Sequence, residues 1–219
     1  MIENYHLEIT KSVFSHEEMQ LLQFVSDARK EKILRYRFFS DRLLSLYAAL
    51  LTRMIVSNRV GVSADKLEIA YESKGKPYLA NTENLYFNLS HTRSCILLCI
   101  SAHQLVGADI EKLNPPPFEI METVFHPDEI YYIESATTNT NVQKFYEIWT
   151  KKEAYLKKTG TGFLHDPSLI NTRLLPVDYC SYRIGDYICT ICSDTIGKVI
   201  RHKITETDIL NFFSINPKL

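Results

Sequence analysis

The sequence lacks the features of a membrane or secreted protein. No stretch approaches the ~18 uninterrupted apolar residues that a membrane-spanning helix requires. The first ten residues place Glu3 and His6 where a signal peptide has a basic start followed by an apolar run. We therefore expect a cytoplasmic protein that has no membrane partner.

An excess of charge of either sign is also missing. The 25 Lys and Arg residues nearly balance the 26 Asp and Glu residues, so the net charge is −1 over 219 residues. This balance does not favour a nucleic acid partner, and an anionic ligand would have to be met by local basic clusters. The length suits one large domain or two small ones.

The cysteine pattern gives no disulfide or zinc framework. Five cysteines are an odd number, and all stand in apolar surroundings. The spacing Cys189-x-x-Cys192 resembles half of a zinc knuckle or a redox pair, but no second ligand pair is evident and the run is of β type. We predict reduced, buried, structural thiols at Cys95, Cys99, Cys180, Cys189 and Cys192.

The first half of the chain has helical patterns followed by strand patterns. Ser15 and Glu18 form a capping box that predicts a helix over 15–24. A second helical pattern begins at Ser26 or Asp27 and is too long for one ordinary helix, so we expect a break at 39–41, where Ser40 would cap a helix ending near Asn58. Strands are expected in LEIAYES, LYFNLSH, SCILLCIS and LVGADIE.

The second half repeats this order after a clear break. Asn114 and the three prolines that follow it mark a boundary there or just before, so we divide the chain into 1–110 and 111–219. A helix should start at His126-Pro127, and another should cover 142–159 and stop at Gly160 and Gly162. Strands are expected in INTRLLP, CSYRIGD and DYICTICS, and the last twenty residues are left unassigned. The repeated order predicts two α+β halves with a cleft between them.

The run VGADIEK places two carboxylates on one face of a strand. Residues two apart in a strand point the same way, so Asp109 and Glu111 lie side by side while Ile110 points into the core. Adjacent carboxylates repel each other unless a cation lies between them, and hard oxygen ligands suit Mg²⁺. The alternative is a solvated strand end in which Glu111 pairs with Lys112.

The run FYEIWTKKEAYLKKTGTGF places a lysine inside an apolar helical stripe. Lys152 falls in the middle of this stripe, and an unpaired buried lysine is costly, so Lys152 should meet an anion. Glu153 and Lys157 lie one turn apart on its flank. The alternative for these two residues is a surface ion pair.

Polar and basic residues elsewhere suggest an anion site. Ser90 and His91 end a strand, and because neighbours on a strand face opposite ways they do not suit a nucleophile–base pair. Arg29 and Lys32 lie three apart on one helical face and could grip an anion or form a solvated face. Lys76 is pinned on a turn between Gly75 and Pro77.

Taken in order, GKPYL, FNLSHT, VGADIEK and FYEIWTKKEAYLKKTGTGF resemble the 4′-phosphopantetheinyl transferases of the Sfp type, in the holo-carrier-protein synthase superfamily. The resemblance runs from Phe24 to Phe163. Arg29 stands where a lysine is common and Ser45 where a threonine is common, and both changes keep the donor.

The resemblance implies two similar α+β subdomains in a pseudo-two-fold arrangement, with the active site in the cleft between them. It implies an enzyme that transfers the 4′-phosphopantetheine moiety of coenzyme A to a serine of an apo carrier protein and releases 3′,5′-ADP. Mg²⁺, with Mn²⁺ as a substitute, would be the metal. The partners would be acyl, peptidyl or aryl carrier protein domains of fatty acid, polyketide or nonribosomal peptide biosynthesis, and the enzyme would be a monomer.

The same resemblance assigns roles to individual residues. The metal ligands would be Asp109, Glu111 and Glu153. The catalytic residues would be Asp109, Glu153, as the base for the serine proton, and Lys157, which would neutralise charge on the phosphate. The residues that bind the adenosine phosphates and base would be Arg29, Lys32, Ser45, Lys76 and His91, with Gly75, Pro77 and Ser90 shaping the pocket. Lys152 would bridge the halves near the metal.

Two other classes of function remain open from the sequence. One is a binding module for coenzyme A or a nucleotide that has no turnover, and the other is a metal-dependent phosphohydrolase. Residues 113–125, which include Phe118, Met121 and Phe125, would either offer apolar contacts to a carrier protein or form an interdomain linker that packs on the core.

Overall fold

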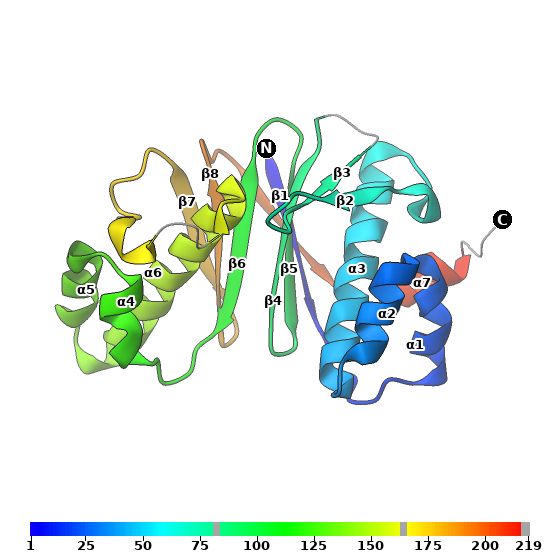
Figure 1. The fold of residues 1–219 in the computed structure, drawn as a ribbon, viewed down its shortest axis with the longest axis horizontal. Helices are drawn as coiled ribbons and strands as arrows, with labels where there is room; N and C mark the ends of the chain where they lie inside the picture. Colours follow the sequence, from blue (N-terminus) through cyan, green and yellow to red (C-terminus); the bar gives the residue numbers. More distant parts are fainter. Residues whose placement is uncertain (81–83, 163–165, 216–219) are drawn as a thin grey trace.

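The computed structural model describes residues 1–80, 84–162 and 166–215 and has an α+β fold (Figure 1). The strands occupy the middle of the molecule, and a group of helices covers each outer side. The described α-helices are α1 (His16–Leu21), α2 (Asp27–Arg35), α3 (Phe39–Val60), α4 (Met121–Val124), α5 (Pro127–Glu134), α6 (Thr138–Thr159) and α7 (Glu206–Ile215). The described strands are β1 (Ile2–Glu8), β2 (Ile69–Tyr71), β3 (Pro77–Leu79), β4 (Tyr86–Thr92), β5 (Cys95–Ser101), β6 (Val106–Lys112), β7 (Asp178–Ile184), β8 (Tyr187–Ser193) and β9 (Val199–Ile204). Among these helices, none has the length and apolar character needed to cross a bilayer.

One sheet forms the centre of the N-terminal half, in the order β4-β5-β1-β9. Strand β5 is buried along its whole length, which explains its unbroken apolar sequence. Its side chains alternate between two cores: Ile96 and Leu98 pack with helix α3, while Leu97 and Cys99 pack against the second sheet. The strand therefore joins the helical layer to the sheet of the other half.

The second sheet has the order β6-β8-β7, with all its pairs antiparallel. Helix α6 packs on β6 and β8, and helices α4 and α5 pack with α6 in a third apolar cluster that includes Phe125, Phe145 and Ile148. Strand β6 lies beside β4 of the first sheet, where the Asn88 side chain accepts a hydrogen bond from the Ala108 backbone N–H at 2.9 Å. The middle of the chain thus links the two sheets.

The C-terminal segment returns to the N-terminal half. Strand β9 pairs parallel with β1, with Ile2 opposite Val199, and helix α7 packs on α3. The sequence pattern predicted neither β1 nor β9. The division at 110 and 111 stays a prediction, and the segment from 199 onward contacts the half that precedes that division.

Most predicted element starts and strands are confirmed. Ser15 and Glu18 form the capping box of α1, and the Ser26 hydroxyl accepts from the Arg29 N–H at the start of α2. The prediction that Ser40 caps a helix is wrong, because the chain leaves α2 in an extended conformation at Tyr36 and Ser40 already lies inside α3. Helix α6 ends at Gly160, whose left-handed backbone (φ 70°) suits glycine. Phe163 lies outside the described residues.

The predicted strand INTRLLP is also wrong. Residues 170–176 form turns, and their polar side chains bond to helix α5 instead of a neighbouring strand. Asn171 donates to the Asp128 carboxylate at 2.9 Å, and the Thr172 N–H and hydroxyl donate to Glu129 at 2.8 and 2.6 Å. The prediction from β-forming residues missed these helix contacts. The strands predicted in CSYRIGD and DYICTICS are confirmed as β7 and β8.

The cysteines are free thiols, as predicted, and four of the five are buried. The prediction that Cys180 is buried is wrong, because it lies on β7 at the edge of its sheet and is only half-buried. Cys189 and Cys192 are buried on strand β8, and at a spacing of three they face opposite sides of the sheet. Burial raises the pKa of Cys95 and of Cys192 to about 12, so both remain protonated at neutral pH. These surroundings are those of structural thiols.

Candidate functional site

Asp109 is a buried carboxylate with an unfilled acceptor. It is 2% exposed on strand β6, where Ile110 points into the core as expected. Its Oδ1 lies 2.6 Å from the Lys157 ammonium and accepts from the Ser90 hydroxyl at 2.8 Å. Its Oδ2 is buried and has no hydrogen-bond partner among the described residues. A buried oxygen of this kind is costly unless a ligand supplies the missing contact.

A glycine explains how strand β6 and helix α6 come so close. A Cβ atom at Gly107 would lie 1.9 Å from the Ala154 carbonyl oxygen and 2.5 Å from the Lys158 backbone nitrogen. No side chain larger than hydrogen fits there, and the two backbones are in contact. The contact carries Glu153 and Lys157 of α6 over the carboxylates of β6. The glycine of the predicted motif thus has a packing role that sequence analysis did not assign to it.

Glu111 is held by two neighbours. The Thr92 hydroxyl donates to its carboxylate at 3.1 Å, and the Trp149 indole also bonds to it. Burial raises the pKa of Glu111 and the Asp109 charge raises it further, while these bonds lower it. The structure does not have the alternative pairing of Glu111 with Lys112. The Lys112 ammonium instead lies 6.0 Å from the centre of the Tyr187 ring.

Glu153 completes the acidic group. Burial raises its pKa above the ordinary value, the Lys157 charge opposes this shift, and the charges of Asp109 and Glu111 add to it. The three predicted metal ligands therefore act on one another electrostatically. Over residues 1–80, 84–162 and 166–215, however, no three acidic, His or Cys side chains are gathered as a ready-made metal site. Mutual repulsion and the free Asp109 oxygen fit a hard divalent cation, because oxygen ligands are those that Mg²⁺ prefers.

Lys152 is fully engaged inside the C-terminal half. Its ammonium lies 2.7 Å from the Glu129 carboxylate and donates to the carbonyl oxygens of Pro167 and Ile170 at 2.8 and 2.7 Å. The predicted meeting with an anion is thus confirmed. These contacts do not form the bridge between the halves that the resemblance implied. The Lys152 side chain points from helix α6 toward the loop that follows it, whereas Glu153 and Lys157 face strands β4 and β6.

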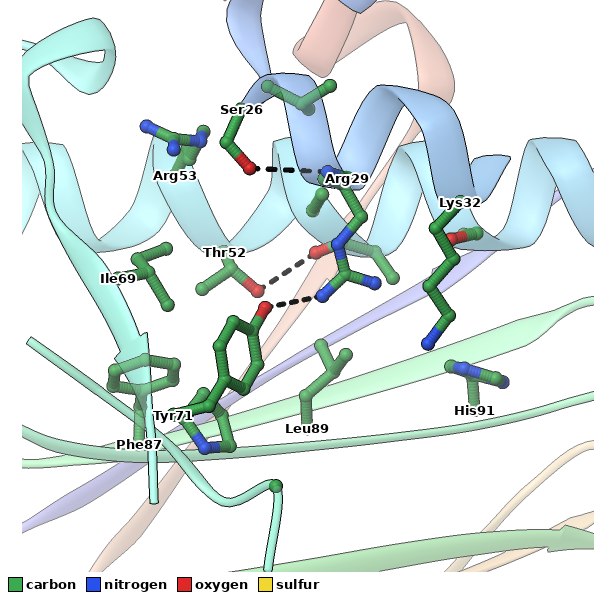
Figure 2. Close-up of a pocket in the computed structure, with 16 residues that line it drawn as sticks. Ser26, Arg29, Lys32, Thr52, Arg53, Ile69, Tyr71, Phe87, Leu89 and His91 are labelled. Carbon is green, nitrogen blue, oxygen red and sulfur yellow. Dashed lines mark hydrogen bonds between the residues drawn. The ribbon is translucent and has the colours of Figure 1, made fainter. Parts of the chain in front are cut away.

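A pocket of about 250 Å³ lies between helices α2 and α3, the β2–β3 pair and strand β4. We call it the nucleotide pocket. Its wall contains six of the residues predicted to bind coenzyme A: Arg29, Lys32, Ser45, Gly75, Pro77 and His91. Figure 2 shows the Arg29 and Lys32 side chains reaching from α2 toward the strands, with the Lys32 ammonium directed at His91. Ile69, Phe87 and Leu89 add an apolar surface.

A second pocket of about 300 Å³ adjoins the first, and its walls come from both halves. The two pockets share Gly75, Pro77 and Leu89. The second also contains Lys76 on one side and Glu153 and Lys157 on the other. The Lys76 ammonium donates to the Lys158 carbonyl at the C-terminal end of α6, where a cation is favourable.

Ser90 and His91 face opposite sides of strand β4, as predicted. Ser90 is bonded to Asp109 and Lys157, while His91 reaches the nucleotide pocket. Burial lowers the pKa of His91, and the positive charges of Lys157, Arg29 and Lys32 lower it further. The imidazole is therefore neutral at pH 7 and belongs to a strongly electropositive region.

Sequence analysis missed several residues of the site. Thr92 lies two residues after Ser90 on the same face of β4, so alternation along the strand could have found it. Trp149 lies in the apolar helical run FYEIWTKKEAYLKKTGTGF, and its apolar neighbours gave no sign of a bond to Glu111. Tyr71 and Arg53 line the nucleotide pocket through long-range packing, and nothing in the sequence signals their position.

Comparison with known proteins agrees with this arrangement. A model described as the N-terminal region of 4′-phosphopantetheinyl transferases matches residues 13–103, and a model of the 4′-phosphopantetheinyl transferase superfamily matches residues 105–194. The 4′-phosphopantetheinyl transferase gsp of Aneurinibacillus migulanus is 30% identical over 162 residues, covering 74% of this chain and 67% of the relative. The psf-1 transferase of Bacillus pumilus is 29% identical over 77% of this chain and 72% of its own length. The Sfp transferase of Bacillus subtilis is 24% identical over 82% of this chain and 75% of its own length. These matches agree with the two adjoining pockets and with the acidic group of β6 and α6. The chain therefore belongs to the 4′-phosphopantetheinyl transferase superfamily, whose members transfer phosphopantetheine from coenzyme A to carrier proteins.

Proposed function

We propose that this chain transfers 4′-phosphopantetheine from coenzyme A to a serine of an apo carrier protein in a reaction that requires Mg²⁺. The active site is the cleft formed by the two adjoining pockets. The observation that carries this proposal is the Asp109–Lys157 pair, in which a buried carboxylate keeps one free oxygen. A lysine beside a cationic pocket suits the binding of a diphosphate, and an incompletely bonded carboxylate suits the divalent cation that would accompany it.

Coenzyme A occupies both pockets in this proposal. Arg29, Lys32 and His91 meet the adenosine phosphates and base in the nucleotide pocket, and Ser45 contributes a hydroxyl. Gly75 and Pro77 shape the junction of the two pockets, and Lys76 lies on the wall of the second. Among the described residues, no carboxylate forms an ion pair with Arg29 or Lys32, so their charges are available to an anion.

Asp109, Glu111 and Glu153 are the residues that would hold Mg²⁺, or Mn²⁺ in its place. When bound, such an ion would offset negative charge on the phosphate oxygens. Thr92 and Trp149 position Glu111 for this role, as residues that orient a metal ligand commonly do. Lys152 has no place among the ligands of coenzyme A in this proposal, since Glu129 and two carbonyl groups take up its ammonium.

The chemical step follows from the remaining groups. The serine Oγ of the carrier forms a bond to the phosphorus that bears pantetheine, and the bond from that phosphorus to the bridging oxygen of the diphosphate breaks. The products are the phosphopantetheinyl serine and 3′,5′-ADP. Glu153, whose pKa is raised by burial, takes the serine proton. Lys157 neutralises charge on the phosphate, because its ammonium already lies in the wall of the second pocket.

The acceptor surface includes the exposed part of residues 113–125. Met121 and Phe125 are buried in the core of the C-terminal half, which supports the packing role for that part of the segment. Phe118 stays partly exposed and contacts the Phe145 ring at its edge. Replacing Phe118 by alanine should raise the KM for the carrier several-fold and leave the KM for coenzyme A unchanged. Equal changes in both constants would contradict an acceptor role.

The deciding experiment incubates the chain with coenzyme A, Mg²⁺ and a panel of apo acyl, peptidyl and aryl carrier proteins, and follows carrier mass. We expect the mass of one phosphopantetheine group to be added to at least one carrier, and the panel would identify the pathway. Binding of coenzyme A with no mass gain would indicate a binding module. Product released to water without a carrier would indicate a phosphohydrolase. The monomeric state and cytoplasmic location stay predictions, and gel filtration tests the first.

A further inference from the structure

Tyr71 lies across the mouth of the nucleotide pocket from helix α2. It ends strand β2, where it is paired with Pro77 of strand β3, and it is 51% exposed. Figure 2 shows its ring standing between the strands and Arg29, with the hydroxyl directed at the guanidinium group. A large aromatic side chain thus forms the outer wall of the pocket.

A direct contact joins Tyr71 to Arg29. An Arg29 Nη2 donates to the Tyr71 hydroxyl at 2.5 Å, and the guanidinium carbon lies 5.9 Å from the centre of the ring. Arg29 itself starts from a fixed backbone, because its N–H donates to the Ser26 side chain that caps α2. Anchoring at both ends reduces the freedom that a long arginine side chain would lose on binding a ligand.

The charges around Arg29 show why this anchoring is needed. Lys32 and His91 face the same pocket, and Arg53 of helix α3 lies close enough for its charge to act on Arg29. Arg53 is itself committed to the carbonyl oxygens of Ala64 and Leu67. Repulsion from Lys32 and Arg53 would turn a free Arg29 toward solvent, whereas the Tyr71 hydroxyl holds it beside the pocket.

We propose that Tyr71 is a positioning residue for coenzyme A, whose hydroxyl holds the Arg29 guanidinium in the orientation that meets an adenosine phosphate. The inference rests on the proposed function, because it assigns a new role at the same site. It applies to binding and not to the transfer step, since Tyr71 is in the wall of the first pocket and outside the walls of the second.

A double-mutant cycle tests the role of the hydroxyl. The variants are Tyr71→Phe, Arg29→Ala and the double variant, and titration calorimetry measures the Kd of coenzyme A and of 3′,5′-ADP. Tyr78→Phe is the matched control, because Tyr78 is 45% exposed on strand β3 and outside the lining of the pocket. We expect Tyr71→Phe to raise both Kd values about three- to tenfold, as for loss of one hydrogen bond to a charged group.

The cycle also tests whether the effect passes through Arg29. In the Arg29→Ala background, Tyr71→Phe should change either Kd by less than about twofold, since coupled residues are not additive. In the transfer assay, Tyr71→Phe should raise the KM for coenzyme A and leave kcat unchanged. An unchanged Kd in Tyr71→Phe, an effect equal to that of Tyr78→Phe, or effects that multiply in the double variant would each overturn the inference. Failure of the wild-type chain to bind coenzyme A would instead overturn the proposed function.

Discussion

Two carboxylate–lysine pairs lie on different faces of helix α6 and differ in how completely they are bonded. On the face toward the loop at 166–172, both Glu129 oxygens are bonded, to Lys152, Thr172 and the His126 N–H. On the face toward strand β6, Asp109 bonds through one oxygen only. The lysines differ as well: the Lys152 side chain is 3% exposed and that of Lys157 is 30% exposed. The saturated pair serves the fold, and the open pair serves a ligand.

Replacing Asp109 by alanine should have the largest effect, on transfer and not on stability. We expect the transfer rate to fall by about 10²- to 10³-fold or more, because the site would lose a ligand for the divalent cation that would offset charge on the phosphate. Lys157 is exposed enough to turn to water, so the free energy of unfolding should change by about 1 kcal/mol or less. Rates measured by carrier mass gain, with urea unfolding in parallel, check both points. Near-normal turnover in Mg²⁺ would contradict the assignment of Asp109.

Replacing Glu129 by glutamine should lower the stability of the fold and leave transfer nearly unchanged. It leaves the Lys152 ammonium buried without its counter-ion, at a cost of about 3–5 kcal/mol in the free energy of unfolding. Adding Lys152→Met should recover part of this loss, and urea unfolding measures both variants. Transfer per folded molecule should change little. A large loss of coenzyme A affinity in folded Glu129→Gln would restore the role at the metal that the resemblance gave to Lys152.

Gly107→Ala tests whether the close contact between β6 and α6 positions the Asp109–Lys157 pair. The added methyl group would overlap the Ala154 carbonyl, and we expect about 1–3 kcal/mol of destabilisation, or more, with a fall in transfer as α6 moves off β6. Gly197→Ala is the matched control, because nothing lies within 4 Å of its Cβ position. Thermal unfolding of the two variants gives the comparison. Equal stabilities would show that the β6–α6 contact yields easily.

The most gradual effect is a pH dependence at a second saturated carboxylate, Glu18 in the N-terminal half. Burial raises its pKa, but bonds from Lys11 and Ser15 outweigh burial and lower the pKa to about 2. An acid with a lowered pKa stabilises the fold above its unfolded value of 4.5, and this stabilisation is lost as pH falls toward 2. Glu18→Gln should therefore cost about 1.5–3 kcal/mol at pH 7 and progressively less between pH 5 and about 2. Urea unfolding across this range checks the trend, and a difference that does not change with pH would contradict it.

Local patterns in the sequence predicted much of this fold. The capping box at Ser15, the alternation that points Asp109 and Ile110 to opposite faces of β6, and the stop at Gly160 depend on neighbours only a few residues away. Six of the residues predicted to bind coenzyme A line the nucleotide pocket. Of the others, Lys76 and Lys157 line the second pocket, Ser90 bonds to Asp109, and Lys152 pairs with Glu129.

Long-range contacts explain what the sequence did not predict. The partner of Lys152 comes from helix α5, and the hydroxyl that holds Arg29 comes from a residue 42 positions away. The β-type pattern at 170–176 was misleading because side-chain bonds to Asp128 and Glu129 take the place of strand pairing. Such contacts depend on how distant segments meet, which no local period records.

The parallel pairing of β1 with β9 has a consequence for biosynthesis. Strand β1 is made long before its partner β9, so the N-terminal sheet has an open edge until residues 199–204 have been made. Contacts this distant in sequence form slowly. The nascent chain should therefore depend on protection of β1 from pairing with other chains, and trimming the chain before Val199 would leave that edge permanently open.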